Sequence, residues 1–145
     1  MIVLDTQPVS QLQRVGSKDA DRIEERLQGI PVDQVRITVI TPIEQLREAL
    51  GKINSANDAM KQVAAFQLFL GLLDHYSRRW SGRILPFDER AVTEFRKFRP
   101  ELIRRIGRCD AQIAAIALAH GATLMTSNKR DFQQVPGLYV EDWLR

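Results

Sequence analysis

The sequence predicts an α/β protein built on a short parallel sheet of four to five strands with helices on both faces. The strand-like runs are short and continuously apolar rather than alternating, which is typical of parallel strands covered on both sides. Helical segments separate most of these runs, as in βαβ units. Because the 145 residues contain no internal repeat and no Pro/Gly-rich linker, residues 1–145 are expected to form a single domain.

Five runs are expected to form strands. The first, MIVLD, starts at residue 1 and ends in a carboxylate, Asp5. The others are VRITVI, RILPF, ATLMTS and GLYVE, at residues 35–40, 83–87, 122–127 and 137–141.

Helices are expected between these strands, and their ends carry recognisable signals. Gly51 and Gly121 are candidate helix stops. Candidate N-caps precede three helical stretches: Ser55 or Asn57, then Asp88, then Asp110. The segment at 111–119, AQIAAIALA, is apolar nearly all round, which predicts a helix buried against the sheet.

The helix expected over residues 55–79 has more apolar surface than one contact needs. Val63, Phe66, Leu70 and Leu73 lie on one face, and further apolar residues cover much of the rest. A surface helix needs only one apolar stripe, so the surplus indicates a second contact, with another copy of the chain or with a partner protein. The alternative is a helix enclosed within the domain.

Composition excludes several classes of protein. Hydrophobic residues make up 44% and charged residues 27%, unlike a disordered or fibrous chain. No apolar run approaches the ~18 residues of a membrane span, and no basic-then-apolar leader is present. We therefore expect a cytoplasmic protein with no membrane partner. The single cysteine, Cys109, has no second thiol for a disulfide.

Positive charge is concentrated in the middle of the chain. Residues 76–108 contain ten Lys or Arg and four Asp or Glu, whereas residues 1–75 sum to −2 and residues 109–145 to −1. Such a segment suits a polyanion, because each phosphate neutralised by Lys or Arg releases counterions. A solvated helix face without a partner is the alternative.

Acidic residues follow the ends of the expected strands. Asp5 ends the first strand, Glu44 lies four residues after the second, in the first turn of the next helix, and Asp110 opens the buried helix. Asn128 and Asp131 follow ATLMTS. Because the carboxyl ends of parallel strands share one edge, where ligands bind, we expect these residues to converge there. Each acid alone also has a structural explanation, at a helix N-terminus or in a turn.

Carboxylates gathered in one place repel one another, and a divalent cation relieves this repulsion. Oxygen ligands without clustered His or Cys favour Mg²⁺ or Mn²⁺ over zinc. His75 and His120 are far apart in the sequence and are expected to be surface or cap residues. Cations held by acids serve phosphate chemistry, so the basic segment makes a nucleic acid the expected substrate.

Five segments carry a resemblance to a known family: MIVLDT, ITPIEQL, RILPFDERAV, CDAQIAAIALAHGATLMTSNKRDF and VPGLYVEDWL. They resemble the PIN domain, specifically the VapC-type ribonuclease toxins of bacterial toxin–antitoxin pairs, and together cover essentially the whole chain. The resemblance implies a three-layer α/β/α fold, endoribonuclease activity with Mg²⁺ or Mn²⁺ and a metal-activated water, inhibition by a small cognate antitoxin, and a homodimer.

The resemblance also assigns roles to individual acids. It places the first acid at Asp5, the motif glutamate at Glu44 and the third acid at Asp110. The fourth falls on Asp131 or is replaced by Asn128, because some members place it directly after Thr-Ser and others three residues later. Metal ligation is expected from Asp5, Asp110 and Asp131.

Residues next to these acids receive supporting roles. Thr6, Thr126 and Asn128 are expected to orient ligands or water. Lys129 and Arg130, with part of the Arg78–Arg108 cluster, are expected to position the RNA backbone. Single-stranded RNA is favoured, because a strand must be splayed out to enter a cleft.

One departure from the family pattern lies beside Asp5. Where the family usually has Asp-Thr-Asn, this chain has Asp-Thr-Gln, and the longer Gln7 side chain cannot make the same short hydrogen bond to a carboxylate without a backbone shift. The alternative function is therefore a catalytically weakened PIN-like protein that binds RNA or an antitoxin without cleaving. A phosphatase of the haloacid dehalogenase type is disfavoured, because it needs a second Asp at position 7.

Overall fold

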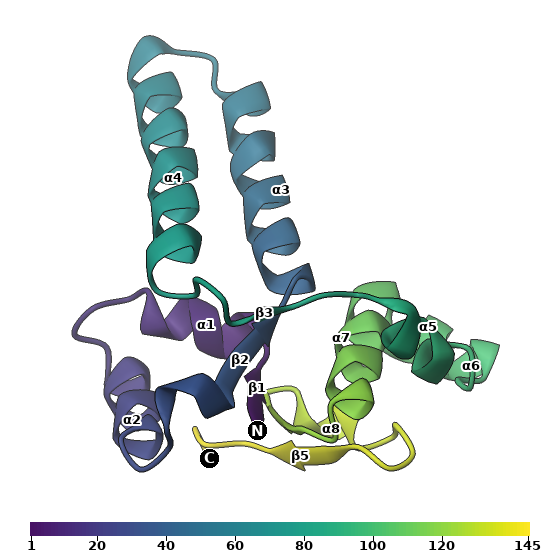
Figure 1. Ribbon diagram of the computed structural model, residues 1–145. Coiled ribbons are helices and arrows are strands. Elements are labelled where there is room, and N and C mark those ends of the chain that lie inside the picture. Colours follow the sequence, from purple (N-terminus) through teal and green to yellow (C-terminus); the bar gives the residue numbers. More distant parts are fainter.

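The computed structural model describes residues 1–145 and contains one five-stranded sheet (Figure 1). All its strand pairs are parallel, and their order is β3-β2-β1-β4-β5. The strands are β1 (Ile2–Leu4), β2 (Val35–Thr38), β3 (Ile84–Leu85), β4 (Thr123–Met125) and β5 (Tyr139–Glu141). The predicted parallel α/β sheet is confirmed, with each strand shorter than the apolar run that predicted it.

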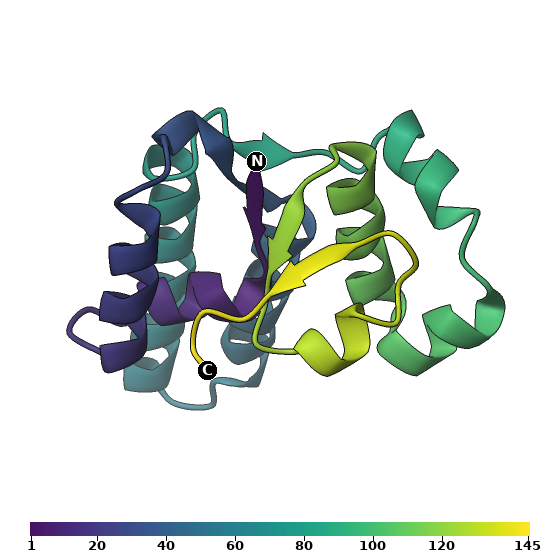
Figure 2. The same cartoon turned by 90° about the horizontal axis from the view of Figure 1, so that it is seen from below.

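Eight α-helices connect the strands. They are α1 (Thr6–Leu12), α2 (Lys18–Leu27), α3 (Ile40–Ser55), α4 (Ala59–Arg78), α5 (Glu89–Phe95), α6 (Pro100–Ile106), α7 (Arg108–Ala119) and α8 (Lys129–Phe132). Seen from below, the strands β1, β4 and β5 lie side by side, with α1 and α2 on one side and α5 to α7 on the other (Figure 2). The molecule is therefore a three-layer α/β/α domain, as predicted.

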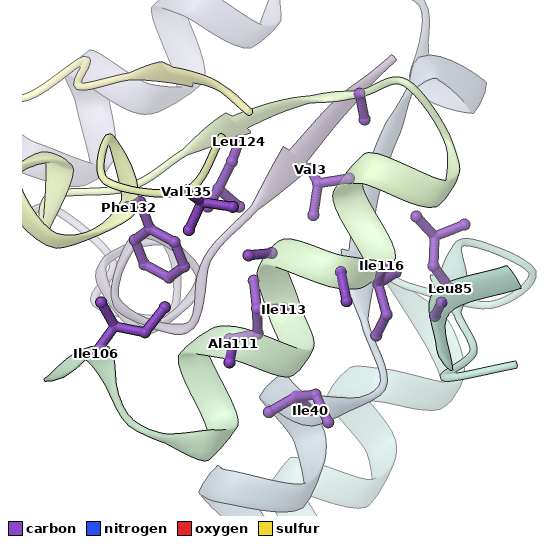
Figure 3. Packing of buried hydrophobic residues seen from close by; sticks show 14 of the residues in the cluster. Val3, Ile40, Leu85, Ile106, Ala111, Ile113, Ile116, Leu124, Phe132 and Val135 are labelled. Atoms are coloured by element: carbon purple, nitrogen blue, oxygen red, sulfur yellow. The ribbon is translucent and has the colours of Figure 1, made fainter. Parts of the chain in front are cut away.

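Alternate residues of the central strands point into two separate cores. Val3 and Leu124 join the core around α7, where Ile113 and Ile116 are buried (Figure 3). Leu4 and its neighbours in the other core pack against α1, α2 and the end of α4. Full burial of such side chains contributes roughly 1.5–3 kcal/mol each, so β1 is held from both faces. The prediction that residues 111–119 form a buried helix is confirmed.

Helices α3 and α4 form an antiparallel hairpin that projects away from the sheet (Figure 1). Two sequence predictions were wrong here. Gly51 lies inside α3 rather than ending it, because a helical glycine costs only about 1 kcal/mol and packing against α4 outweighs that cost. The N-cap of α4 is Asp58, whose carboxylate accepts a hydrogen bond from the Lys61 N–H at 2.9 Å; it is neither Ser55 nor Asn57.

Three other predicted helix ends can be compared with the structure. The Asp88 carboxylate caps α5 by accepting from the Ala91 N–H at 3.1 Å, and Gly121, at φ 57°, follows α7; both predictions are confirmed. Asp110 is not an N-cap, because Gly107, at φ 92°, lets α7 begin at Arg108. Asp110 instead lies inside the first turn.

None of the helices has both the length and the apolar character that a membrane span requires.

Candidate active site

The topology places a ligand-binding crevice at the end of β1. From the central strand β1, the chain first adds β2 and β3 on one side of β1 and later adds β4 and β5 on its other side. Such a reversal of strand order opens a crevice beyond the carboxyl ends of the strands, where open α/β sheets bind ligands. Asp5 follows β1 at this point, and Thr126 follows β4.

Asp5 is fixed by hydrogen bonds on both carboxylate oxygens. Its Oδ1 accepts from the Thr6 N–H at 2.8 Å, which caps α1, and its Oδ2 accepts from the Thr126 hydroxyl at 2.7 Å. The Asp5 N–H donates to the Met125 carbonyl at 2.9 Å. Burial raises the pKa of Asp5, although the hydrogen bonds from the Thr126 hydroxyl and the Thr6 N–H act to lower it. The carboxylate is thus held rigidly at the switch point.

Glu44 reaches the same crevice from α3. Because α3 begins at Ile40, Glu44 lies in the second turn of the helix rather than the predicted first. Burial raises the pKa of Glu44, and the charge of Asp5 raises it further. Its Oε1 is buried without a hydrogen-bond partner. An unpartnered buried carboxylate oxygen is costly, so Glu44 offers a free acceptor to a ligand.

Asp110 enters from the first turn of α7. Burial raises its pKa from 3.8 to about 7, with further contributions from the negative charges of Asp5, Glu44 and Asp131. Negative charges raise the pKa of a neighbouring carboxyl when they lie in the same region. The four predicted acids therefore approach the same edge of the sheet.

A chain of hydrogen bonds links the acids across the loop after β4. The Thr126 hydroxyl, which donates to Asp5, accepts from the Asn128 N–H at 2.9 Å. The Asn128 side-chain amide donates to Asp131 Oδ2 at 3.0 Å, and it also stabilises the charged form of Asp110, lowering its pKa. Asn128 therefore holds the Asp131 carboxylate in place, and the fourth position that the resemblance implies falls on this pair of residues.

Gln7 does not bond to a carboxylate. Its side-chain oxygen accepts from the Ser127 hydroxyl, across the mouth of the crevice. Beneath it, the hydroxyls of Thr6 and Thr41 lie 3.0 Å apart. Ser127 and Thr41 were not predicted as site residues. Their positions could have indicated them, because Ser127 lies between Thr126 and Asn128 and Thr41 directly follows the strand-like run at residues 35–40.

The remaining predicted residues lie at the edge of the site or outside it. Lys129 and Arg130 are exposed at the start of α8, beside Asn128. His75 accepts a hydrogen bond from the Trp80 indole N–H at 3.2 Å, and His120 caps the end of α7. Neither histidine joins the acids.

The donor set at this crevice fits a hard divalent cation. Every candidate ligand is an oxygen, one of them is buried and unpartnered, and three of the acids have raised pKa values. As the side chains stand, no three Asp, Glu, His or Cys groups are close enough to hold an ion. By donor type alone, this all-oxygen set suits Mg²⁺ or Mn²⁺ rather than zinc.

A three-layer α/β/α domain with an acid-lined crevice at its switch point is the architecture of a PIN-type protein. The PIN domain family model matches residues 2–138. The chain therefore belongs to the PIN domain family, and its curated relatives are VapC-type proteins.

One such relative is the tRNA(fMet)-specific endonuclease VapC of Salmonella typhimurium, 35% identical over 63 residues that make up 41% of this chain and 48% of the relative. The matched segment thus spans about half the length of that relative. Ribonuclease VapC1 of Rickettsia felis is 30% identical over 106 residues, or 70% of this chain and 72% of the relative. In structure, the chain is similar to VapBC-1 of nontypeable Haemophilus influenzae, with a TM-score of 0.71, 26% identity and full coverage of both chains.

Proposed function

We propose that this chain is a metal-dependent endoribonuclease, the VapC-like toxin of a toxin–antitoxin pair. The observation that carries the proposal is the chain of hydrogen bonds from Asp5 through Thr126 and Asn128 to Asp131, at the carboxyl ends of β1 and β4. Glu44 and Asp110 approach the same edge from α3 and α7. The names of the relatives, an endonuclease specific for tRNA(fMet) and a ribonuclease, support an RNA substrate.

In this proposal Asp5, Asp110 and Asp131 hold Mg²⁺ or Mn²⁺, with Glu44 as a further oxygen donor. When bound, such a cation polarises the phosphodiester and lowers the pKa of water, which favours hydrolysis. Thr126 keeps Asp5 aimed at the crevice, and Asn128 does the same for Asp131. Partners of this kind orient metal ligands, and their loss typically reduces metal affinity 10–100-fold.

Lys129 and Arg130 serve the substrate rather than the cation. Both side chains are exposed at the crevice edge, and neither has a carboxylate partner within ion-pair distance. Free cations in this position neutralise phosphates of a bound strand. A strand that approaches a recessed crevice must be unpaired, so single-stranded or loop RNA is the proposed substrate.

The test is cleavage of single-stranded RNA in excess Mg²⁺ or Mn²⁺. Asp5→Asn and Asp110→Asn should each abolish cleavage while circular dichroism shows an intact fold, because each removes one charged ligand. Asp33→Asn, at an exposed position remote from the crevice, is the matched control and should cleave as the wild type does. Full activity of both site variants would exclude the assignment.

A catalytically weakened PIN-like protein, which binds RNA or an antitoxin without cleaving, is the second candidate. The observation that favours it is the Gln7 side chain, which bonds to Ser127 instead of to an acid. Tight RNA binding with no products at any Mg²⁺ or Mn²⁺ concentration would select this candidate. Cleavage by the wild type, lost in Asp110→Asn, selects the first.

The proposed protein partner is a cognate antitoxin that binds the α3–α4 hairpin. The sequence alternative of an enclosed α4 is excluded, because Val63, Phe66, Leu70 and Leu73 are 47%, 56%, 65% and 44% exposed. Their spacing of three, four and three residues is that of a helix-packing seam. An amphipathic antitoxin segment can lie along such a seam, with its charged tail in the crevice.

We also propose a homodimer, since α3 carries exposed apolar residues of its own, Ile43 and Leu50. Co-expression with the product of the neighbouring gene, followed by size-exclusion chromatography with light scattering, tests both partners. The expected result is a co-eluting complex with two copies of this chain. A monomer that elutes alone would count against both.

A further inference from the structure

A groove with a volume of about 500 Å³ lies beside α6 and the turn that follows α8. This volume is within the usual range of ligand sites. Basic, apolar and amide side chains line it, among them Lys97, Arg99, Leu102, Arg105 and Gln134, and Glu101 adds one carboxylate. The groove therefore combines groups that bind phosphate with groups that contact a sugar or a base.

Helix α8 and the turn after it connect the groove with Asp131. The Gln134 N–H donates to the Asp131 carbonyl at 3.1 Å, so Gln134 lies one helical turn beyond a proposed metal ligand. The Gln134 side-chain oxygen accepts from Arg105 Nη1 at 2.9 Å, and its amide nitrogen is 3.4 Å from the Arg130 carbonyl. Gln134 thus fixes the Arg105 guanidinium at the wall of the groove.

Two arginines of the groove are not neutralised. Arg99 and Arg105 are exposed and have no carboxylate within ion-pair distance. By contrast, Lys97 pairs with Glu94 at 3.1 Å, and Arg104 pairs with Glu101 at 3.6 Å. One Arg105 N–H is used by Gln134, which leaves four donors for an anion.

The three arginines between the end of α4 and β3 make contacts within the domain. Arg78 pairs with Asp74 at 2.6 Å, and Arg79 pairs with Glu24 at 2.7 Å. Arg83 bonds to backbone carbonyls and lies over the Trp80 ring at 4.7 Å. Within the basic segment, the arginines without a carboxylate partner are Arg83, Arg96, Arg99, Arg105 and Arg108, and four of these lie on α6 or beside its ends.

We propose that this groove is a subsite for single-stranded RNA, which holds a nucleotide flanking the bond that is cleaved. Arg99 and Arg105 bind its phosphate, and the half-buried Leu102 contacts its sugar or base. The proposal rests on the proposed function, since the crevice that the groove extends is the proposed site of cleavage.

The test is the salt dependence of RNA binding, measured by fluorescence anisotropy with a labelled single-stranded oligoribonucleotide in EDTA, where no cleavage occurs. Each phosphate contact contributes about 0.7 to the slope of log affinity against log salt for a single strand. The double variant Arg99→Gln/Arg105→Gln should lower that slope by about 0.7, because both arginines bind the same phosphate. Arg26→Gln, an exposed arginine on α2, is the matched control and should leave it unchanged.

A wild-type slope in the double variant, with an unchanged thermal midpoint, would overturn the proposal. An equal loss in Arg26→Gln would also overturn it, since the effect would then be one of net charge. Equal losses for duplex RNA of the same length would refute the preference for a single strand. Arg105→Lys in the otherwise wild-type chain keeps the charge and should therefore retain most of the wild-type slope.

Cleavage kinetics separate this inference from the proposed function. If the wild type cleaves RNA, the double variant should raise KM at least tenfold with kcat little changed, because the acids are intact. If the wild type cleaves nothing but the slope falls as expected, the proposed function fails and the groove stands. Cleavage by the wild type with an unaltered KM in the double variant would refute the groove alone.

Discussion

Replacement of Asp110 by Asn should stabilise the metal-free protein by an amount that grows as the pH rises from about 4 to about 7. In the folded state the pKa of Asp110 is raised to about 7 by burial and by three neighbouring acids. The unfolded chain ionises near the ordinary value of 3.8. Below pH 4 the group is protonated in both states and contributes nothing. As the pH rises from about 4 to about 7, the unfolded state loses its proton first, so stability falls.

The magnitude follows from the difference between these two pKa values. At 1.36 kcal/mol per pKa unit, the ionised form costs the folded state roughly 4 kcal/mol above pH 7. Because Asp110 is only partly buried, solvent screening reduces this to about 2 kcal/mol. Asparagine carries no charge, so it should recover that amount at pH 8. For a domain of this size, the gain corresponds to a rise of about 4–8 °C in Tm.

The assay is thermal unfolding of wild type and Asp110→Asn in EDTA at pH 4, 6 and 8, with Asp33→Asn as the control. The expected gain is near zero at pH 4 and largest at pH 8. Mg²⁺ added to the wild type at pH 8 should narrow the difference, since a cation relieves the same repulsion. The same gain at pH 4 and pH 8, or a loss at pH 8, would refute the electrostatic reasoning.

Three further outcomes are expected. Thr126→Val breaks the hydrogen bonds to Asp5 and Asn128 and should lower the free energy of unfolding by about 1–3 kcal/mol, measured by urea titration; an unchanged midpoint would contradict the linking role of Thr126. Leu70→Ser, at a position that is 65% exposed, should change stability by no more than about 0.5 kcal/mol yet abolish co-elution with the antitoxin, and a complex that survives would remove α4 from the interface. Phe132→Ala, at a fully buried position, should cost about 3–5 kcal/mol in the same titration, and a smaller loss would show that α8 is weakly anchored.

The sequence predicted the sheet and the buried helix α7 well, because both depend on apolar patterning. A run such as MIVL is buried on both faces wherever the sheet forms, so its period and length are sufficient. Helix ends were predicted less well. Gly51 and Asp110 were misjudged because tertiary packing of the α3–α4 hairpin and the positive φ of Gly107 decided those ends.

The convergence of the acids could be predicted because parallel strands bring their carboxyl ends to one edge. The individual side-chain contacts of the site could not be predicted, because they depend on side-chain conformations. Examples are the hydrogen bond between Gln7 and Ser127, the unpartnered Oε1 of Glu44, and the hydrogen bond from Asn128 to Asp131. The basic segment likewise gave no sign of which arginines are neutralised.

The proposed metal site can be tested most directly by locating Mn²⁺ in a soaked crystal from its anomalous scattering. If the proposed site binds the cation, a peak is expected in the crevice within about 2.0–2.3 Å of oxygens from Asp5 and Asp110, with Asp131 rather than Asn128 as the third residue. A crystal in saturating Mn²⁺ with no peak in the crevice, or with its only peak elsewhere on the surface, would contradict the proposal.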